Sequence, residues 1–315
     1  MLKKNSRIFV AGHNGMVGSS ILRKLKEKKY TNIITMHKKK LNLLNQNDVK
    51  KFFQKTKIEH VILAAARVGG IYANNTKRAQ FLYENLTIQN NVMHYAYESG
   101  VKNLIFLGSS CVYPNTFLRP IKESDLLSNY LEKTNEPYAI AKLAGIKMCE
   151  NYSKDFDLNY KCLMPCNLFG INDNFDLKNS HFIPGIMHKI YLAKLKRKKK
   201  VVLFGTGSSL REVMYVDDLA EAVLFFLKKK TKDKLINIGS GYEKTINFYI
   251  KKIQKVLNAE KIQIIFDQNK ELDGTKRKLL NTSLARKYQW KSKYSFDFGI
   301  KKTYDFFLKK IVTVY

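Results

Sequence analysis

A tyrosine and a lysine stand four residues apart within the segment Asn135-Glu-Pro-Tyr-Ala-Ile-Ala-Lys142. On a helix, side chains at this spacing share one face, so the phenol of Tyr138 would lie beside the ammonium of Lys142. A free phenol has a pKa of roughly 10 and a nearby cation favours the phenolate, so we predict that Tyr138 exchanges protons at neutral pH. The same spacing also occurs on ordinary helix surfaces, and its meaning therefore depends on what accompanies it.

Three glycines stand far upstream of this pair, in Gly12-His-Asn-Gly-Met-Val-Gly18. They follow the apolar run Arg7-Ile-Phe-Val-Ala11 and precede apolar residues at helical spacing, so we predict a strand, a tight turn and a helix. In such a turn the glycines allow a bend, a close approach of the backbone to a pyrophosphate, and packing of helix on strand. The motif predicts a dinucleotide site, whereas an isolated match would equally describe a glycine-rich turn.

The second strand is predicted at residues 32–36 and is followed by His37-Lys-Lys-Lys40. An NAD-specific site would offer a carboxylate to the ribose at this point. The chain offers cations instead, which could bind a 2′-phosphate, so we predict NADP(H) as the cofactor. The alternative is that these lysines reflect only the basic composition of the chain.

The order of the remaining elements predicts an α/β fold with a Rossmann-type, doubly wound parallel sheet. Buried strands are expected at 60–65, 102–108 and 160–165, and they alternate with helices at 47–55, 81–97 and 138–152. Two side chains that can do chemistry, Ser109 and Cys111, directly follow the strand at 102–108. Open α/β sheets bind their ligands at this end of their strands.

The alternation weakens after residue 170, where turns such as 204–207 and 237–241 separate short segments. We therefore predict a Rossmann domain at 1–170 and a smaller C-terminal α/β substrate-binding domain at 171–315. The segment near 212–241 is expected to return to the first domain. The junction of the two is the expected position of the substrate.

Composition excludes several other classes of protein. The chain has 315 residues, is 45% hydrophobic and carries a formal charge of +31, but its lysines are spread over nearly every segment. We attribute the charge to composition and predict no nucleic-acid partner. The four cysteines have no zinc-ligand or disulfide spacing, and no metal is predicted. No run of membrane-spanning length or secretory signal is recognised, so the expected location is the cytoplasm, with no membrane partner.

Several longer motifs resemble the extended short-chain dehydrogenase/reductases, and within them the GDP-L-fucose synthases. The similarity runs almost from end to end, and many of these motifs are more specific than a glycine turn. They are AGHNGMVGS near the start, LNLL at 41–44, AAARVGGIYANNT at 64–76, LGSSCVYP at 107–114, TNEPYAIAKLAGIK at 134–147, NSHFIP at 179–184 and DGTKRKLL at 273–280.

The resemblance implies an NADPH-dependent enzyme that converts GDP-4-keto-6-deoxy-D-mannose to GDP-L-fucose by 3,5-epimerisation and 4-reduction. It assigns Ser109, Tyr138 and Lys142 to reduction, and Cys111 and His181 to acid/base exchange at two ring carbons. It also implies a homodimer formed through the helices near 77–98 and 137–153. The cofactor contacts that we predict are Gly12, Asn14, Gly15, Met16, Val17, Gly18, Lys38, Lys39, Ala64, Ala65, Leu107, Gly108, Tyr138, Lys142, Pro165, Asn167, Leu168 and His181.

The same resemblance implies contacts with a GDP-linked 4-keto-deoxy sugar from Lys189, Phe204, Arg211, Asp273 and Lys278. The chain departs from the common pattern at some positions, with Asn14 and Lys189 where arginine is frequent. Three alternatives remain open. They are the same chemistry on a GDP-4-keto-6-deoxy-heptose, a 4-reductase without epimerase activity, and a nucleotide-sensing or RNA-binding relative that retains the fold without catalysis.

Overall fold

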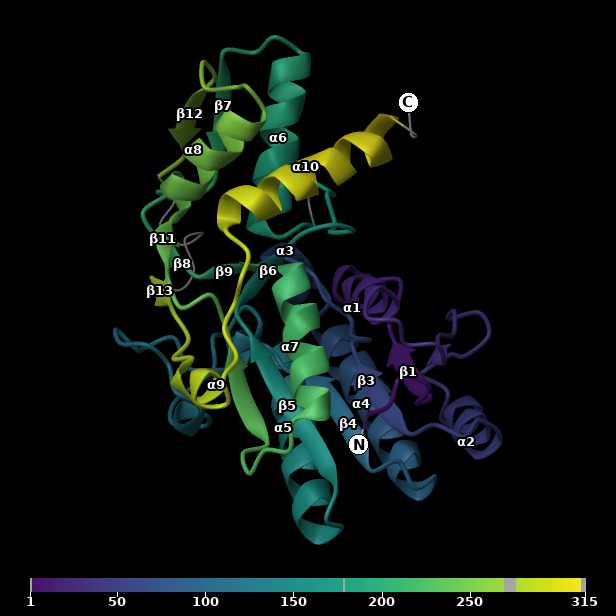
Figure 1. Cartoon of the computed structure of the whole chain (residues 1–315). Coiled ribbons are helices and arrows are strands. Elements are labelled where there is room, and N and C mark those ends of the chain that lie inside the picture. Colours follow the sequence, from purple (N-terminus) through teal and green to yellow (C-terminus); the bar gives the residue numbers. More distant parts are fainter. Residues whose placement is uncertain (1, 178, 269–275, 313–315) are drawn as a thin grey trace.

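The computed structural model describes residues 2–177, 179–268 and 276–312, and a six-stranded parallel sheet forms the centre of its larger part (Figure 1). The strand order is β10-β5-β4-β3-β1-β2. Every neighbouring pair is parallel, which confirms the predicted fold class. The strands are β1 (Ile8–Ala11), β2 (Ile33–Ile34), β3 (His60–Leu63), β4 (Asn103–Leu107), β5 (Asn159–Pro165) and β10 (Leu235–Ile238).

Helices cover both faces of this sheet (Figure 1). On one face α1 packs against α7, and on the other α4 packs against α2 and α5. Local signals start these helices where the sequence predicts: Asn45 caps α2 by accepting from the Asp48 backbone N–H at 3.1 Å, and Pro137 lies in the first turn of α5. The bounds are α1 (Met16–Glu27), α2 (Gln46–Lys55), α4 (Arg78–Glu98), α5 (Glu136–Asp155) and α7 (Val216–Lys228).

The strand order reverses between β1 and β3, because the chain passes from β1 to β2 on one side and then crosses to β3 on the other. The loops that follow β1 and β3 meet at this point. Gly12 has a φ of +87°, and a Cβ placed on it would lie 2.6 Å from the backbone nitrogen of Ala65. Both loops therefore belong to the switch point at which open α/β sheets hold their ligands.

A second, smaller part of the structure has its own core, which includes Met187, Tyr249, Ile300 and Phe307. It follows β6 (Asn167–Phe169), which pairs with β9 rather than with the main sheet. Its other elements are α6 (Phe182–Leu195), β7 (Lys200–Leu203), β8 (Leu210–Arg211), β9 (Val213–Tyr215), β11 (Lys244–Thr245), α8 (Ile246–Val256), β12 (Gln263–Phe266), β13 (Arg277–Lys278) and α10 (Phe296–Val312).

The chain does not divide cleanly at residue 170. The segment at 237–241, predicted as a turn, starts within β10, which pairs in parallel with β5 in the main sheet. Helix α9 (Ser283–Lys287) and the nearby Trp290 also contribute to the core of the larger part. Two short 3-10 helices, η1 (Ser110–Val112) and η2 (Glu123–Asp125), and the helix α3 (Ile71–Thr76) complete the described elements.

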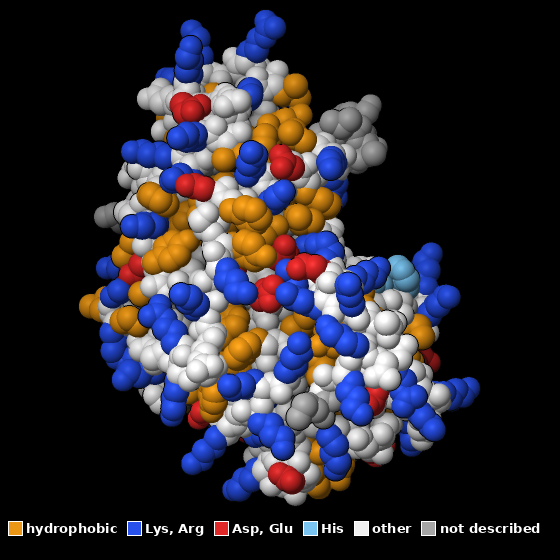
Figure 2. Space-filling model, viewed as in Figure 1, with side chains coloured by type: hydrophobic (Ala, Val, Ile, Leu, Met, Phe, Trp, Pro, Cys, Tyr) orange, Lys and Arg blue, Asp and Glu red, His pale blue; other side chains and the backbone are white. Residues whose placement is uncertain are grey.

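The surface is basic over both parts of the molecule. Figure 2 shows lysine and arginine side chains spread over the visible face, with few acidic ones between them and no single stripe. This distribution fits a compositional origin of the charge better than a nucleic-acid groove. Among the described residues no helix has both the length and the apolar character needed to cross a bilayer.

Candidate active site

The end of β4 and the start of α5 bring together four of the predicted catalytic side chains. Ser109 lies two residues after the end of β4, and its hydroxyl interacts with both the phenol of Tyr138 and the thiol of Cys111. The same Ser109 oxygen accepts from the Cys111 backbone N–H at 3.4 Å. Lys142 is buried one helical turn after Tyr138, and its Nζ donates to the carbonyl oxygen of Leu107 at 2.8 Å. The serine, the thiol, the phenol and the ammonium thus form one group.

Burial controls the ionisation of this group. Burial raises the pKa of Tyr138, and the charge of Cys111 raises it further. The interaction with Ser109 lowers this pKa but does not outweigh the other two effects. The prediction that Lys142 lowers this pKa is wrong for the protein described here. The ammonium lies 5.7 Å from the ring centroid of Tyr138 and donates to Leu107, while burial lowers its own pKa to about 8. A phenol that retains its proton at neutral pH is suited to act as an acid.

Cys111 connects this group to two cations of the smaller part. Its side chain is 8% exposed, and burial raises the pKa of its thiol against the opposing charge of Lys278. Burial also lowers the pKa of Lys278, an effect that Cys111 opposes and the charge of Arg211 reinforces. Lys278 and Arg211 are direct neighbours in the pairing of β13 with β8. Two predicted substrate contacts therefore adjoin the predicted catalytic thiol.

His181, the fifth predicted catalytic residue, is the N-cap residue of α6, and its side chain makes no capping hydrogen bond to that helix. Its ring is accessible to water, but the surrounding protein desolvates it enough to lower its pKa. Within the described part of the chain no hydrogen bond joins it to the other four residues. Its connection to them is indirect, because the preceding Asn179 accepts from the backbone N–H of Gly70 at 3.1 Å in the loop after β3.

The loop after β3 is connected to Tyr138 through the ring of Phe81. A Cβ on Gly69 would lie 3.2 Å from the ring of Phe81, and the Phe81 ring meets Tyr138 edge-on with their centroids 6.3 Å apart. The structure thus places His181 on a segment that borders the Tyr138 group, and its approach to a shared substrate remains a prediction.

The other predicted substrate contacts lie on separate elements. The Nζ of Lys189, on α6, is 4.5 Å from the ring centroid of Phe204, which is 67% exposed. Burial lowers the pKa of Lys189, and the charge of Asp267 opposes this. Asp273 falls outside the described residues.

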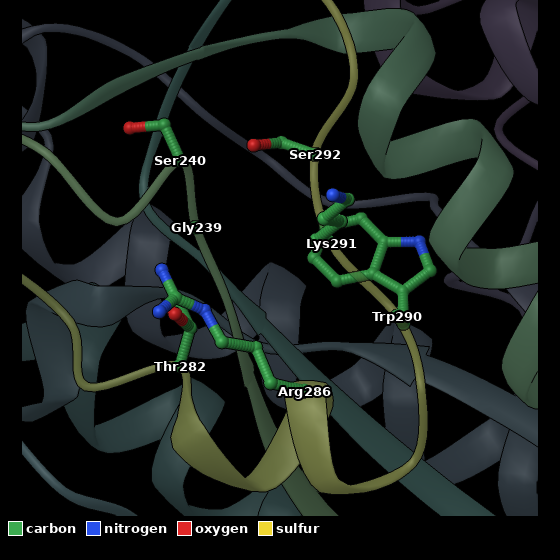
Figure 3. A pocket seen from close by; sticks show the side chains of 7 residues that line it. All are labelled: Gly239, Ser240, Thr282, Arg286, Trp290, Lys291 and Ser292. Carbon is green, nitrogen blue, oxygen red and sulfur yellow. The ribbon is translucent and has the colours of Figure 1, made fainter.

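A small hollow at the end of β10 lies away from this chemistry (Figure 3). It is lined by Gly239, Ser240, Thr282, Arg286, Trp290, Lys291 and Ser292. None of these residues was predicted to act in catalysis. In Figure 3 the Ser240 hydroxyl points away from the guanidinium of Arg286. It instead donates to Glu212 at 3.4 Å and to the carbonyl oxygen of Tyr242 at 3.2 Å.

Most of the predicted cofactor contacts follow the carboxyl ends of the strands of the main sheet. They lie after β1, β2 and β3, at the end of β4, and from the end of β5 into β6, whereas Tyr138 and Lys142 lie on α5 and His181 precedes α6. The loop after β1 fits a dinucleotide. A Cβ on Gly18 would lie 2.0 Å from the Gly12 carbonyl oxygen, so helix and strand are in contact, whereas a Cβ on Gly15 would meet nothing closer than 3.6 Å. Because α1 has no side-chain cap and no acidic residue in its first turn, its free N–H groups face space that a pyrophosphate could occupy.

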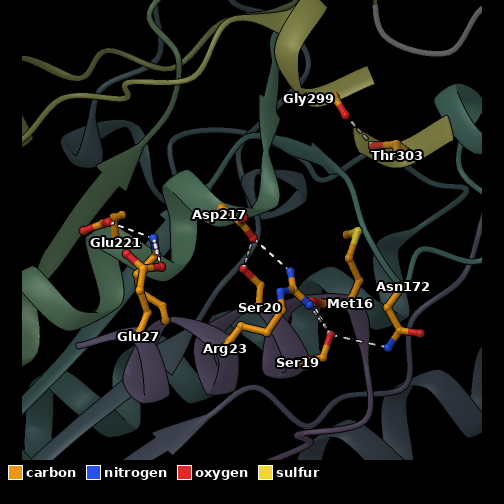
Figure 4. Close-up of polar contacts among 11 residues, drawn as sticks. Met16, Ser19, Ser20, Arg23, Glu27, Asn172, Asp217, Glu221, Gly299 and Thr303 are labelled. Carbon is orange, nitrogen blue, oxygen red and sulfur yellow. Dashed lines mark hydrogen bonds and ion pairs between the residues drawn. The ribbon is translucent and has the colours of Figure 1, made fainter. Parts of the chain in front are cut away.

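Side chains beyond the glycine motif hold α1 in place (Figure 4). Asp217 on α7 accepts from Ser20 at 2.5 Å and from Arg23 at 2.9 Å. Asn172 donates to the carbonyl oxygen of Asn14, in the glycine loop itself, at 2.7 Å. The sequence analysis missed Asn172 and Asp217, because their partners are distant along the chain and no local motif marks them.

The expected 2′-phosphate region lies beside the same loop. The amide of Asn14 is 3.1 Å from Nδ1 of His37, and the ring of His37 meets that of His13 edge-on. Lys38 and Lys39 follow directly and are exposed. Cationic side chains thus stand next to the loop that fits the pyrophosphate.

Comparison with known proteins agrees with this geometry. Residues 8–239 match the NAD dependent epimerase/dehydratase family. The chain belongs to that family. It is 48% identical over 311 residues to GDP-L-fucose synthase 1 of Arabidopsis thaliana, and the aligned region covers 99% of this chain and 96% of that protein. This finding confirms the resemblance to GDP-L-fucose synthases that the motifs indicated.

Two solved structures of this epimerase/dehydratase type extend the comparison. A GDP-6-OMe-4-keto-L-xylo-heptose reductase from C. jejuni is 31% identical, with a TM-score of 0.92 over 98% of this chain and 99% of that one. A GDP-L-fucose synthetase from Naegleria fowleri, bound to NADP, is 28% identical, with a TM-score of 0.90 over 99% of this chain and 96% of that one.

The glycine loop allows a test of its role that is independent of catalysis. A methyl group at position 15 has room in the folded protein but occupies the space above the first turn of α1. We expect Gly15→Ala to retain its melting temperature and to lose most of the increase in melting temperature that NADPH produces. Gly18→Ala should instead melt lower without any ligand, since its Cβ collides with backbone. Full stabilisation of Gly15→Ala by NADPH would contradict this assignment.

Proposed function

We propose that this epimerase/dehydratase family member converts GDP-4-keto-6-deoxy-D-mannose to GDP-L-fucose, by epimerisation at C3 and C5 and reduction at C4. One observation carries the proposal: the Cys111 thiol interacts with Ser109 and with the charges of Lys142 and Lys278, and Lys278 is the register partner of Arg211 in the pairing of β13 with β8. A reductase alone needs the serine, tyrosine and lysine. A reactive thiol beside them, bordered by cations suited to a diphosphate, supports a second reaction on the same sugar.

Epimerisation depends on the ketone at C4, because it makes the hydrogens on C3 and C5 acidic. Removal of either hydrogen places negative charge on O4, and the hydroxyls of Ser109 and Tyr138 stabilise it by hydrogen bonds. The thiolate of Cys111 removes a proton from one face of the ring. The imidazole of His181 returns a proton on the other face, which inverts the carbon.

Reduction uses the same oxygen. The bound nicotinamide supplies a hydride to C4, and the protein controls the accompanying proton. Tyr138 donates its proton to O4 as charge develops there, and its raised pKa keeps that proton in place until the reaction starts. Lys142 lies one turn away and is the residue expected to bind the nicotinamide ribose.

The nucleotide end of the substrate is assigned to cations of the smaller part. Arg211 can bind a phosphate through two N–H groups, and Lys278 adds a point charge beside it. Lys189 with Phe204, and Asp273, are the remaining predicted contacts. Because Lys278 lies between Arg211 and Cys111 in the network of charges, a diphosphate held there would deliver the sugar toward the thiol.

A GDP-4-keto-6-deoxy-heptose is the main alternative substrate. The C. jejuni neighbour, whose fold is closely similar, is a reductase of a GDP-linked keto-heptose. In addition, Lys189 stands on the substrate side at a position where arginine is common. A 4-reductase without epimerase activity is the second alternative. Both keep the Ser109–Tyr138–Lys142 chemistry, so only the substrate and the exchange of ring hydrogens separate them.

The cofactor assignment can be tested by affinity. We propose NADPH over NADH, supported by Lys38 and Lys39 beside the glycine loop and by the NADP-bound structural neighbour. The double variant Lys38→Ala/Lys39→Ala should bind NADPH about tenfold more weakly and NADH almost unchanged, as measured by quenching of protein fluorescence. Lys51→Ala, on the exposed side of α2, is the control and should leave both affinities unchanged. Equal affinities of the unmodified protein for the two cofactors would contradict the proposal.

The assembly can be tested by sedimentation. We propose a homodimer formed through α4 and α5, supported by their packing together and by Tyr83 on α4, which is 66% exposed. Tyr83→Glu should shift the sedimentation velocity from that of a dimer to that of a monomer. Leu195→Glu, which changes an equally exposed apolar residue on α6, should not. A monomeric unmodified protein would refute this interface.

We further propose a cytoplasmic location, supported by four buried free thiols and testable by cell fractionation.

The central experiment follows both reactions at once. Incubation with GDP-4-keto-6-deoxy-D-mannose and NADPH in heavy water should yield GDP-L-fucose with deuterium at C3 and C5, observed by NMR. The rate of exchange should stay nearly constant around neutral pH, because burial raises the pKa of the Cys111 thiol and lowers that of His181, and the reaction needs the thiolate and the imidazolium together. No turnover of this ketosugar, with turnover of a heptose analogue, would overturn the choice of substrate.

A variant separates the two reactions. Cys111→Ser should lose deuterium uptake by about 100-fold or more, yet still reduce a ketosugar that has already been epimerised, because the reduction requires only the serine, tyrosine and lysine. Cys149→Ser changes a buried thiol on the far part of α5 and is the matched control. Product without deuterium from the unmodified protein would favour a simple 4-reductase.

A further inference from the structure

A glutamate that lies next to Arg211 in the chain carries an unassigned role. Glu212 connects β8 to β9 and is fully buried, with no exposed surface. A buried carboxylate is costly unless its oxygens are hydrogen-bonded, and it is usually paired with a cation. Among the described residues no lysine or arginine pairs with Glu212, so its contacts should reveal why it is tolerated.

Its partners are backbone N–H groups from two distant segments. One carboxylate oxygen accepts from the backbone N–H of Gly241 at 2.7 Å and from the hydroxyl of Ser240 at 3.4 Å. The other accepts from the backbone N–H of Leu280 at 2.9 Å. The side chain therefore joins the segment that follows β10 to the segment that follows β13.

Those bonds fix the position of the two cations assigned to the substrate. Lys278 pairs with Arg211 in the register of β13 with β8, and Leu280 is two residues further along the same extended segment. On the other side, the Tyr249 hydroxyl donates to the Arg211 carbonyl oxygen at 2.8 Å. The strand pairing of β8 with β13 is only two residues long, and the side chain of Glu212 adds a bond to the backbone just beyond it, beside the backbone bonds that join Leu279 and Asn281 to Ile121.

We propose that Glu212 is a positioning residue of the nucleotide-sugar site, which holds Arg211 and Lys278 at the spacing that binds a diphosphate. This inference rests on the proposed function, since it takes these two cations as the diphosphate contacts. Only a carboxylate suits the role. An amide in its place would turn an NH2 group toward one of the two backbone N–H donors, and that contact would be lost.

The role predicts a dependence on pH. Burial raises the pKa of Glu212 to about 7, so it loses its charge as the pH falls through neutrality, and one of its oxygens then carries a proton toward an N–H donor. The other titratable groups near it are Cys166 at the end of β5 and Tyr249 on α8, and burial raises the pKa of both. They therefore stay uncharged near pH 7, and Arg211 stays charged. Burial lowers the pKa of Lys278, so a loss of its charge as the pH rises would weaken the binding of a diphosphate. Glu212 is the group among these whose ionisation would strengthen that binding as the pH rises.

The test is the affinity for GDP-mannose, measured by calorimetry between pH 6 and pH 8. This probe has no terminal phosphate, so the ligand itself does not titrate near the second pKa of roughly 6 that a phosphate monoester would show. We expect the unmodified protein to bind it more tightly as the pH rises. Glu212→Gln should bind it about 10- to 100-fold more weakly at pH 8, and its affinity should no longer rise with pH. The affinity for NADPH should not change.

Controls separate the role in positioning from general damage. Glu243→Gln alters a neighbouring glutamate, which accepts from the side chain of Arg277 at 2.6 Å, and should keep both the affinity and its pH dependence. Glu212→Asp retains the charge and should recover part of the affinity. If Glu212→Gln does not fold, the pH titration is made with Lys278→Ala, which lacks the opposing group, and an affinity of that variant that is flat from pH 6 to pH 8 overturns the proposal.

Two more variants tell this proposal apart from the one on which it rests. Arg211→Ala and Lys278→Ala should each weaken the binding of GDP-mannose. If neither does, the assigned substrate site is wrong. If both do, but Glu212→Gln binds the probe with unmodified affinity and pH dependence, the substrate site stands and the role of Glu212 is refuted.

Discussion

The hydrogen bond from the buried ammonium of Lys142 to the carbonyl oxygen of Leu107 is the constraint on which the site depends. It ties the first turns of α5 to the last residue of β4. Tyr138 lies one turn before this lysine, and Ser109 and Cys111 lie two and four residues beyond the carbonyl. A single contact thus sets the distance between the helix that carries the phenol and the loop that carries the hydroxyl and the thiol.

Burial of this contact also determines the protonation states of its neighbours. The same desolvation that lowers the pKa of Lys142 raises those of Tyr138 and Cys111. At neutral pH the phenol and the thiol therefore keep their protons, and little charge is buried before a substrate arrives. Charge that develops on a ketone oxygen in this place meets hydrogen-bond donors that are already oriented, which is the most effective form of electrostatic stabilisation. Because both reactions charge that one oxygen, one set of donors suffices for both.

Local spacing explains which parts of the site could be predicted from the sequence. The glycine loop and the Tyr138–Lys142 pair were accessible because each lies within one strand-turn-helix unit or one helix. The direction of the Tyr138 pKa was not accessible, because spacing places a cation nearby but says nothing about burial or about a competing acceptor such as Leu107. Strand β10 was mistaken for a turn, since its four residues are followed at once by glycine and serine. Glu212 was passed over because its partners, Gly241 and Leu280, come from distant segments.

The segment at 170–181 explains how the two parts of the molecule can act on one substrate. Near its start Asn172 donates to Asn14 of the glycine loop, and near its end Asn179 accepts from Gly70 in the loop after β3. These are the loops that follow the two strands at the switch point of the sheet. His181, the N-cap residue of α6, lies two residues after Asn179, so the start of this helix of the smaller part is close to a contact with the larger part. The start of α6, with His181, is therefore joined through Asn179 to the loop after β3, and the same segment is joined through Asn172 to the glycine loop proposed to bind the cofactor.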